Sequence, residues 1–366
     1  MNQQSERPII DLVAGTRPNF VKIGPLFHHL KETSWCLPRL IHTGQHYSSE
    51  LSEDIWMDLN LPPPFIVLEG GRGSHAEQTG TLMIAYEKSC LASAPSLVVV
   101  PGDVNSSLAC ALAARKLGIP IAHLEAGLRS HDASMPEEIN RRLIDHMADI
   151  LWTPSEDADK NLQTEGISLS KVHRVGNIMI DALKSLKSRI DGSPPPVTFP
   201  RYGVLTLHRP SNVDFRERLR DIVTVIEEIS QKIPILFPVH PRARQRLEEF
   251  GLWDQIVGCP NIQATKSLSY IRFLGAVARS SFVLTDSGGL QEETSYLGIP
   301  CFTLRENTER PITITLGTNE LVRLESASRR VRERIDEVTV PRTIPLWDGH
   351  TSERIGNHLN TYLASH

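Results

Sequence analysis

Cysteine is scarce in this sequence of 366 residues, and its five cysteines form no recognisable pattern. There is no C-x-x-C pair and no histidine at ligand spacing from a cysteine, which argues against a zinc site or a disulfide framework. We expect no metal site and reduced, mostly buried thiols at Cys36, Cys90, Cys110, Cys259 and Cys301. A catalytic cysteine is the weaker alternative, because none has the setting of a nucleophile.

The sequence also lacks a long apolar run and an excess of basic residues. No stretch nears the roughly 20 apolar residues of a membrane helix, and the N-terminus has no charged segment followed by an apolar one. With 39 basic and 43 acidic residues the net charge is −4, so no broad basic field attracts a nucleic-acid backbone. We expect a cytoplasmic protein without a membrane or nucleic-acid partner. An anionic small molecule held by a few local cations is compatible with this charge.

Solenoid repeats are absent as well, and the rhythm of the sequence is that of strands alternating with helices. Short apolar runs recur, each followed by turn residues and a helical pattern, as in "SLVVVPGD" and again in "SFVLTDSGG". Continuous apolar runs between helices predict parallel sheets covered on both faces. The sequence therefore predicts an α/β fold.

The length of the sequence and this rhythm predict two doubly wound domains, which we place at 1–187 and 201–350. The linker between them is expected at 188–200, where three consecutive prolines prevent a helix or a central strand. Residues 351–366 have apolar positions at helical spacing and predict a final helix, with packing against the first domain as one option. Ligands of such folds lie at the carboxyl ends of strands, so the two sheets should face a central cleft.

Polar residues follow nearly every predicted strand. Asp103 and Glu125 come directly after buried runs, and burying an acid costs several kcal/mol unless it is paired or protonated. His208 and His240 each end an apolar run beside an arginine. One such histidine is more often structural, whereas two together favour contact with a ligand.

Two helix starts have the character of anion sites. In "GTRPNFVKIGPL" Arg17 and Lys22 would add positive charge to free N–H groups, although no G-x-G-x-x-G or Walker pattern is present. In "TDSGGLQEETSYLG" the residues Ser287, Gly288 and Gly289 offer N–H groups to a phosphate. Glu293 lies four residues into that helix and suits a ribose hydroxyl. Arg310 would neutralise diphosphate, with Glu309 orienting it, and the alternative is a surface ion pair of little energetic value.

The helix that begins "PEEINRRLIDHM" opens on proline and two acids. Negative charge at the positive end of the helix dipole explains one of these acids structurally. The other is then available for chemistry, close to Glu125.

Taken in order, these motifs resemble the non-hydrolysing UDP-N-acetylglucosamine 2-epimerases. The resemblance rests on "GTRPNFVKIGPL", "TGQHY", "GDVNSSLACAL", "HLEAGLRS", "PEEINRRLIDHMAD", "VGNIMIDAL", "LTLHRP", "PVHPR", "DSGGLQEE" and "LRENTERP", and it spans about Ile9 to Val322. It implies two Rossmann-like domains in the GT-B architecture and, usually, a homodimer.

The resemblance also implies a reaction. Members interconvert UDP-GlcNAc and UDP-ManNAc without NAD or metal, by anti elimination of UDP to 2-acetamidoglucal and re-addition of UDP. Such chemistry needs acids and bases near C2 and cations at the departing diphosphate. By motif, Asp103, Glu125 and Glu137 are the acid/base carboxylates and His208 assists near the diphosphate, which leaves Glu138 the structural role. Which carboxylate removes the C2 proton stays open.

The other positions carried over by motif contact the nucleotide. They are Arg17, Lys22, Phe273, Ser287, Gly288, Gly289, Glu293 and Arg310, with Phe273 near the uracil. The sequence departs from many bacterial members where Pro210 and Ser211 replace residues of a second, allosteric UDP-GlcNAc site. Gln45 and His240 match other parts of that site, so a remnant of it is expected and allosteric activation by substrate is in question.

Three alternatives stay open at this point. A related epimerase acting on another UDP-2-acetamido sugar, such as a diacetamido uronic acid or a 6-deoxy sugar, would share the nucleotide residues. A hydrolysing relative would differ at the strand-end motifs. A GT-B glycosyltransferase would share the fold without needing Asp103, Glu125 and Glu137, and a non-catalytic sugar-nucleotide sensor would not need them either.

Overall fold

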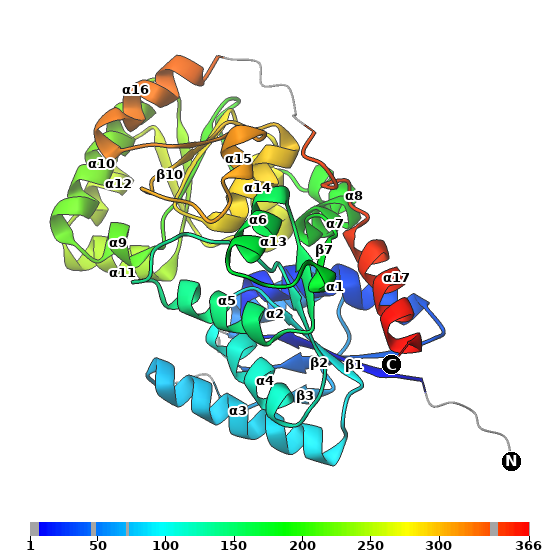
Figure 1. The fold of residues 1–366 in the computed structure, drawn as a ribbon. Helices are drawn as coiled ribbons and strands as arrows, with labels where there is room; N and C mark the ends of the chain where they lie inside the picture. Colours follow the sequence, from blue (N-terminus) through cyan, green and yellow to red (C-terminus); the bar gives the residue numbers. More distant parts are fainter. Residues whose placement is uncertain (1–6, 45–48, 71–72, 337–342, 366) are drawn as a thin grey trace, which may run out of the picture. The chain divides into compact units, whose positions relative to one another are not determined.

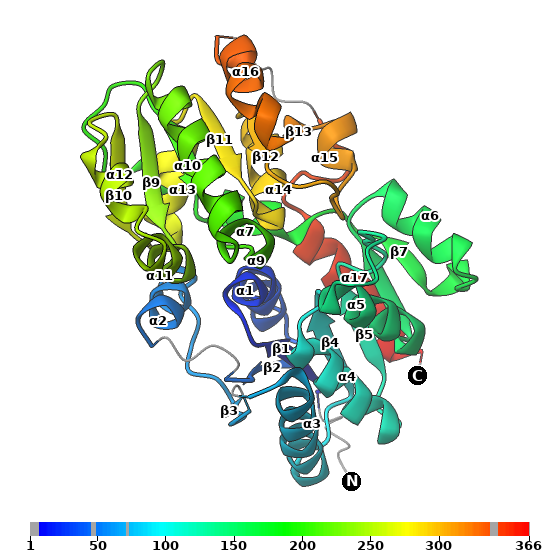
Figure 2. The same ribbon diagram turned by 90° about the vertical axis from the view of Figure 1, so that its left-hand side faces the viewer.

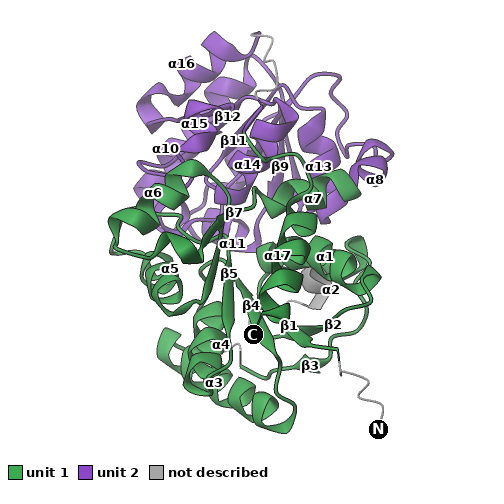
Figure 3. Cartoon of the chain, turned by 45° about the vertical axis from the view of Figure 1, so that its right-hand side comes forward, with its two compact units in different colours: residues 1–185, 345–366 green, residues 186–344 purple. Residues whose placement is uncertain are grey.

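The computed structural model describes residues 7–44, 49–70, 73–336 and 343–365, with the backbone alone at 49–53. The chain divides into two compact units (Figure 3). Unit 1 consists of Met1–Ser185 and Pro345–His366, and unit 2 of Leu186–Ile344.

Unit 1 is built on a parallel sheet of seven strands within the described residues, in the order β3-β2-β1-β4-β5-β6-β7. The strands are β1 Ile9–Ala14, β2 Leu37–His42, β3 Ile66–Val67, β4 Leu97–Pro101, β5 Ile121–Leu124, β6 Ile150–Thr153 and β7 Val172–Arg174. The helices are α1 Arg17–Glu32, α2 Ser49–Asp58, α3 His75–Ala92, α4 Asn105–Lys116, α5 Pro136–Met147, α6 Glu156–Thr164, α7 Ile178–Ser185 and α17 Thr351–Ala364, with a short 3₁₀ turn at Leu169–Lys171. Helices α3 and α4 pack side by side (Figures 1 and 2).

Unit 2 repeats the plan with six parallel strands in the described part of the chain, in the order β10-β9-β8-β11-β12-β13. The strands are β8 Gly203–Thr206, β9 Ile235–Val239, β10 Ile262–Lys266, β11 Phe282–Thr285, β12 Cys301–Thr303 and β13 Asn319–Leu321. The helices are α8 Lys187–Asp191, α9 Pro210–Val213, α10 Arg216–Ser230, α11 Pro241–Glu249, α12 Trp253–Gly258, α13 Tyr270–Ala278, α14 Gly288–Leu297, α15 Ile312–Thr315 and α16 Leu324–Arg334.

Both faces of each sheet are buried, as the continuous apolar runs predicted. In unit 2, Val204 and Leu205 are neighbours on β8 but belong to two different apolar clusters, because successive side chains of a strand point to opposite faces. The strand order reverses between β1 and β4 in unit 1, and between β8 and β11 in unit 2. This is the doubly wound order of Rossmann folds, which confirms the predicted α/β fold class.

The segments that join the two units are themselves packed. Residues 188–200, predicted as a linker, belong to unit 2, where the Arg279 guanidinium donates to the carbonyl of Ser193 (Nη1–O 3.0 Å). The second unit ends at Ile344, before the predicted boundary at 350, and the chain then returns to unit 1. Trp347 anchors this return, since its buried indole N–H donates to the carbonyl of Pro154 (3.0 Å).

The C-terminal helix α17 packs on α1 and α7 within unit 1 (Figure 3). Its first turn is capped by Asp181 of α7, which accepts the N–H groups of Thr351 (3.1 Å) and Ser352 (2.7 Å) and the Ser352 hydroxyl (2.8 Å). A side chain distant in sequence thus satisfies N–H groups that a helix start leaves unpaired. Among the described residues no helix combines the length and apolarity needed to cross a membrane.

Replacing Asp181 by alanine should therefore weaken the docking of α17. Two buried N–H groups lose their acceptor, and we expect the free energy of unfolding to fall by about 1–3 kcal/mol. Chemical denaturation followed by tryptophan fluorescence measures this, with Asp191→Ala as the control, because the side chain of Asp191 forms an exposed pair with Lys187. Equal effects of the two substitutions would contradict the capping role.

Candidate active site

The polar residues of unit 1 gather where β1, β4 and β5 end. Lys22, in the second turn of α1, forms an ion pair with Glu125, which directly follows β5, and both side chains are buried. Gly102, at the end of β4, makes room for this pair, since a Cβ there would lie 3.0 Å from the Lys22 ammonium. The predicted acid at position 125 is thus buried and paired with a cation that the sequence analysis had assigned to the nucleotide.

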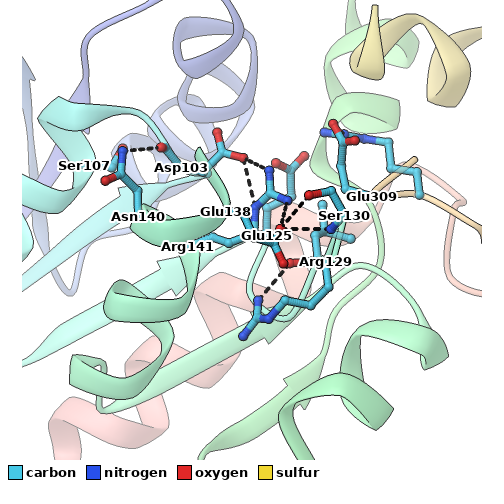
Figure 4. A network of polar contacts seen from close by, with 12 residues as sticks. Asp103, Ser107, Glu125, Arg129, Ser130, Glu138, Asn140, Arg141 and Glu309 are labelled. Atoms are coloured by element: carbon cyan, nitrogen blue, oxygen red, sulfur yellow. Dashed lines mark hydrogen bonds and ion pairs between the residues drawn. The ribbon is translucent and has the colours of Figure 1, made fainter. Parts of the chain in front are cut away.

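A second buried cation, Arg141 of α5, joins two acids (Figure 4). Its guanidinium donates to Asp103 (Nη2–Oδ2 2.5 Å) and to Glu138 (Nη1–Oε2 2.6 Å). Glu138 also accepts the N–H (2.9 Å) and the hydroxyl (2.9 Å) of Ser130, in the loop after β5. Asp103, with 30% of its side chain exposed, is the more open of the two acids that Arg141 joins.

The two neighbouring acids of α5 differ sharply. Glu138, which the sequence analysis left with a structural role, is buried in the network, whereas Glu137 is exposed. Consecutive helical residues point about 100° apart, so only one of the pair can face the network. The spacing of Glu138, Arg141 and Asp145 on one face of the helix is a signal that could have identified Glu138.

The turn between β1 and α1 is held by Asn19. Its side-chain oxygen accepts the N–H of Thr16 (3.1 Å), and its amide donates to the carbonyl of Pro101 at the end of β4 (3.2 Å). Gly15 is needed here, because a Cβ would lie 2.2 Å from the Ser106 hydroxyl. Arg17 follows as the first, half-buried residue of α1.

In unit 2 the strand ends centre on Asp286, a fully buried acid that the sequence analysis did not single out. One carboxylate oxygen lies 2.7 Å from the Nδ1 atom of His208, and the other accepts the backbone N–H of Arg209 (2.9 Å). Burial opposes its ionisation, but the hydrogen bonds and charge of His208 and the N–H groups outweigh burial, so the pKa of Asp286 is lowered. Its position directly after a buried strand is the same signal that identified Asp103 and Glu125.

His240 begins α11, and its ring centre lies 5.8 Å from that of His208. Its Nδ1 atom accepts the N–H of Arg242 (3.3 Å), so one role of this histidine is to cap the helix. Gln45, the other position matched to an allosteric site, lies outside the described residues.

Arg310 is held over the start of α14 by two buried acids. Its guanidinium donates to Glu309 (2.6 Å) and lies 3.0 Å from Glu292. Gly288 permits this approach, since a Cβ would lie 2.7 Å from Arg310 Nη1. Burial raises the pKa of Glu309, yet the charges of Arg310 and Arg305 prevail and hold the pKa well below its usual range. This pair is therefore buried and not the exposed ion pair of the alternative interpretation.

The remaining nucleotide candidates lie on α13 and α14. Ser287, Gly288 and Gly289 begin α14 and are partly exposed. Glu293 is buried one turn further on and accepts the hydroxyl of Tyr270 (2.6 Å), a partner that the sequence analysis missed. Phe273, also on α13, packs against the apolar cluster of Tyr202 and Leu290.

No group of three or more His, Cys, Asp or Glu within the described residues is arranged to hold a metal ion.

Comparisons with known proteins identify the family of this chain. The family model of UDP-N-acetylglucosamine 2-epimerase matches residues 28–360. The UDP-N-acetylglucosamine 2-epimerase of Methanocaldococcus jannaschii is 44% identical over 86% of this chain and 88% of its own length. A UDP-2,3-diacetamido-2,3-dideoxy-D-glucuronate 2-epimerase of Pseudomonas aeruginosa is 38% identical over 85% and 87%.

A solved structure is similar over nearly the whole chain. The crystal structure of Methanocaldococcus jannaschii UDP-GlcNAc 2-epimerase in complex with UDP-GlcNAc and UDP matches with a TM-score of 0.89 and 40% identity, covering 96% of this chain and 99% of that one. Two Rossmann-like units with acids and cations at their strand ends place the chain among GT-B-like α/β enzymes. Within that class the chain belongs to the UDP-N-acetylglucosamine 2-epimerase family, a family of isomerases.

The Lys22–Glu125 pair yields a stability prediction. Replacing Lys22 by methionine keeps the apolar stem but removes the charge beside a buried carboxylate, and we expect the free energy of unfolding to fall by about 3 kcal/mol. Adding Glu125→Gln should recover part of this loss, because the uncompensated charge is then gone.

Chemical denaturation of the single and double variants measures both effects. Lys187→Met is the matched control, because the ion pair of Lys187 with Asp191 is exposed and should change stability by less than about 1 kcal/mol. A loss for Lys22→Met no larger than for the control would contradict the prediction.

Proposed function

We propose that this protein interconverts UDP-GlcNAc and UDP-ManNAc by inverting C2 of the sugar. The proposal is carried by two carboxylates, Asp103 and Glu125, that follow adjacent strands, each beside a buried cation, in a chain of the UDP-N-acetylglucosamine 2-epimerase family. Acids placed in this way suit inversion at a carbon, because one group must remove the proton from C2 and a group must return a proton to its opposite face.

The proposed reaction begins with an elimination. A carboxylate takes the proton from C2, the C2–H electron pair forms the C1–C2 double bond, and the bond from C1 to the diphosphate oxygen breaks, giving 2-acetamidoglucal and UDP. Return of a proton to the opposite face of C2, with re-addition of the diphosphate oxygen to C1, completes the inversion. Asp103, Glu125 and Glu137 are the proposed acid/base groups, and His208, beside the buried Asp286, is proposed to act near the diphosphate.

We assign the holding of UDP mainly to unit 2. The N–H groups at Ser287, Gly288 and Gly289 and the guanidinium of Arg310 suit the diphosphate, because helix starts and arginine both attract phosphate oxygens. Glu293 would accept ribose hydroxyls, with the Tyr270 hydroxyl orienting its carboxylate. Phe273 is proposed to lie against the uracil, and Arg17 and Lys22 of unit 1 to add charge at the phosphates.

A second candidate substrate is another UDP-2-acetamido sugar. The Pseudomonas aeruginosa relative, which acts on a diacetamido glucuronate, is 38% identical to this chain, close to the 44% of the UDP-GlcNAc 2-epimerase of Methanocaldococcus jannaschii. The residues proposed for UDP and for proton transfer at C2 would serve either sugar. We favour UDP-GlcNAc as the substrate because the sequence identity to the Methanocaldococcus jannaschii UDP-GlcNAc 2-epimerase is the larger of the two.

Two further features stay proposals that rest on the resemblance and the sequence, namely a homodimer and a cytoplasmic location. Sedimentation of the purified protein would test the first and fractionation of cells the second. An allosteric site is proposed only as a remnant. The resemblance implies that Pro210 and Ser211, which lie in the short helix α9, replace residues that help to form this site in many bacterial members.

Exchange at C2 tests the proposed reaction directly. Incubation of the purified protein with UDP-GlcNAc in D₂O should yield UDP-ManNAc with deuterium at C2. NMR spectroscopy measures both the epimerisation and the deuterium incorporation. Release of free ManNAc would instead indicate a hydrolysing enzyme. Absence of exchange with UDP-GlcNAc and with UDP-diacetamido sugars would refute the proposal.

Substitutions should separate the proton-transfer groups from the UDP-holding groups. Asp103→Asn and Glu125→Gln remove a base without removing size, and we expect exchange at C2 to fall at least about 100-fold while UDP affinity changes little. Arg310→Ala should weaken UDP binding by about 10-fold or more, since it removes a charge-assisted hydrogen bond. Calorimetric titration with UDP and the exchange rate measure both, and normal exchange in the two carboxamide variants would refute the assignment.

A further inference from the structure

A buried chain of charged groups lies behind the proposed acids of unit 1. His123 of β5, fully buried, has its Nδ1 atom 2.6 Å from Oδ1 of Asp145 on α5. The other oxygen of Asp145 lies 2.7 Å from Arg129, and Arg129 in turn donates to both oxygens of Glu165 (2.8 and 2.7 Å). None of these groups is among those proposed above to touch the substrate.

Both ring nitrogens of His123 face acceptors. The Nε2 atom lies 2.9 Å from the carbonyl oxygen of Gly102, which can only accept, so Nε2 donates there. A further proton must then lie between Nδ1 and the Asp145 carboxylate for the 2.6 Å contact to be a hydrogen bond. The ring is therefore fixed in orientation from both sides.

His123 and Asp145 each form a hydrogen bond with the backbone next to one of the proposed acids. The Gly102 carbonyl, which His123 binds, belongs to the residue immediately before Asp103. The Gly127 N–H, which Asp145 accepts at 3.2 Å, lies two residues after Glu125. One buried pair thus holds the ends of β4 and β5 together at the level of the backbone.

The loop after β5 needs such support at one residue. The φ angles are +61° at Gly102, +73° at Glu125 and +80° at Gly127, and of these three residues only Glu125 has a side chain that the left-handed conformation strains. At Glu125, which has a side chain, this conformation costs on the order of 1 kcal/mol and persists only where the surroundings enforce it. The hydrogen bond that His123 donates to the Gly102 carbonyl and the one that Asp145 accepts from the Gly127 N–H are contacts able to enforce it.

We propose that His123 is a positioning residue that, with Asp145, holds Asp103 and Glu125 in the geometry for proton transfer at C2. This inference rests on the proposed function. It separates two roles in unit 1, since Lys22 and Arg141 supply charge to the acids while His123 fixes the backbone that carries them.

The two hydrogen bonds of His123 can be tested one at a time. In His123→Gln the side-chain amide reaches the position of Nε2 and keeps a donor for the Gly102 carbonyl. In His123→Asn it reaches only the position of Nδ1 and keeps the contact with Asp145. The two variants are alike in polarity, so each serves as the control for the other.

We expect the two variants to differ in kcat and to agree in binding. His123→Asn should lose about 100-fold in the kcat of C2 exchange, the size expected when reacting groups shift by about 1 Å, whereas His123→Gln should lose about 10-fold or less. KM and the Kd of UDP should stay within about twofold of the parent protein. Equal kcat losses in two folded variants would overturn the proposal, because a merely structural histidine would not distinguish them.

A crystal structure of each variant gives a readout independent of turnover. Asp103 should keep its contact with Arg141 in His123→Gln and move away from it in His123→Asn, and an unmoved Asp103 in the latter would overturn the proposal. If the parent protein shows no C2 exchange, the proposed function fails while this structural comparison still decides the positioning role.

Should the His123 variants fail to fold, Asp145→Asn tests the same pair with almost no change of shape. We expect its kcat to fall about 10-fold or more while the Kd of UDP is unchanged. An unchanged kcat would overturn the proposal.

Discussion

A carboxylate buried at the end of a parallel strand requires a compensating charge, and the polar interior of both units is arranged around this requirement. At the strand ends Glu125 is paired with Lys22, Asp286 with His208 and the partly exposed Asp103 with Arg141, and in the loop after β12 the buried Glu309 is paired with Arg310. Removing one partner of such a pair costs about 3–5 kcal/mol, so each acid and its cation depend on one another. The glycines at 102 and 288 follow from the same requirement, because a Cβ at either would crowd the cation.

Under the proposed function the pairing also fixes a cation before its ligand binds. Arg310 is oriented by Glu309 and Glu292, and so its guanidinium would be fixed before the proposed diphosphate binds. An ordered donor loses less conformational entropy on binding than a free side chain, which favours a fixed site for developing negative charge. In unit 1 the same logic applies to Asp103, whose carboxylate is both oriented by Arg141 and partly exposed.

Much of this could be predicted from the sequence, because apolar runs reveal strands and the residue after each run lies at the carboxyl edge. Asp103, Glu125 and His208 were found in this way. Glu138 was not, because the choice between two consecutive acids depends on which face of α5 is turned inward, and only the spacing of Glu138, Arg141 and Asp145 indicates that face. Packing of the C-terminal helix on the first domain was one predicted option, but the point of return was placed at 350 and not after Ile344. The anchoring of Trp347 depends on a tertiary contact with Pro154 and leaves no periodic pattern.

Backbone strain adds an argument that side-chain pairing cannot supply. Among the described residues other than glycine, a positive φ occurs at Asn60, Glu125, His131 and Leu346. Two of these four, Glu125 and His131, lie in the single loop after β5, and the His131 N–H donates to Glu138 (3.2 Å). Glycine would adopt both conformations without strain, so the side chains at these positions are retained against a conformational cost. At position 125 the carboxylate that pairs with Lys22 is the reason for a side chain where glycine would be unstrained. The surrounding hydrogen bonds hold the loop in this strained conformation.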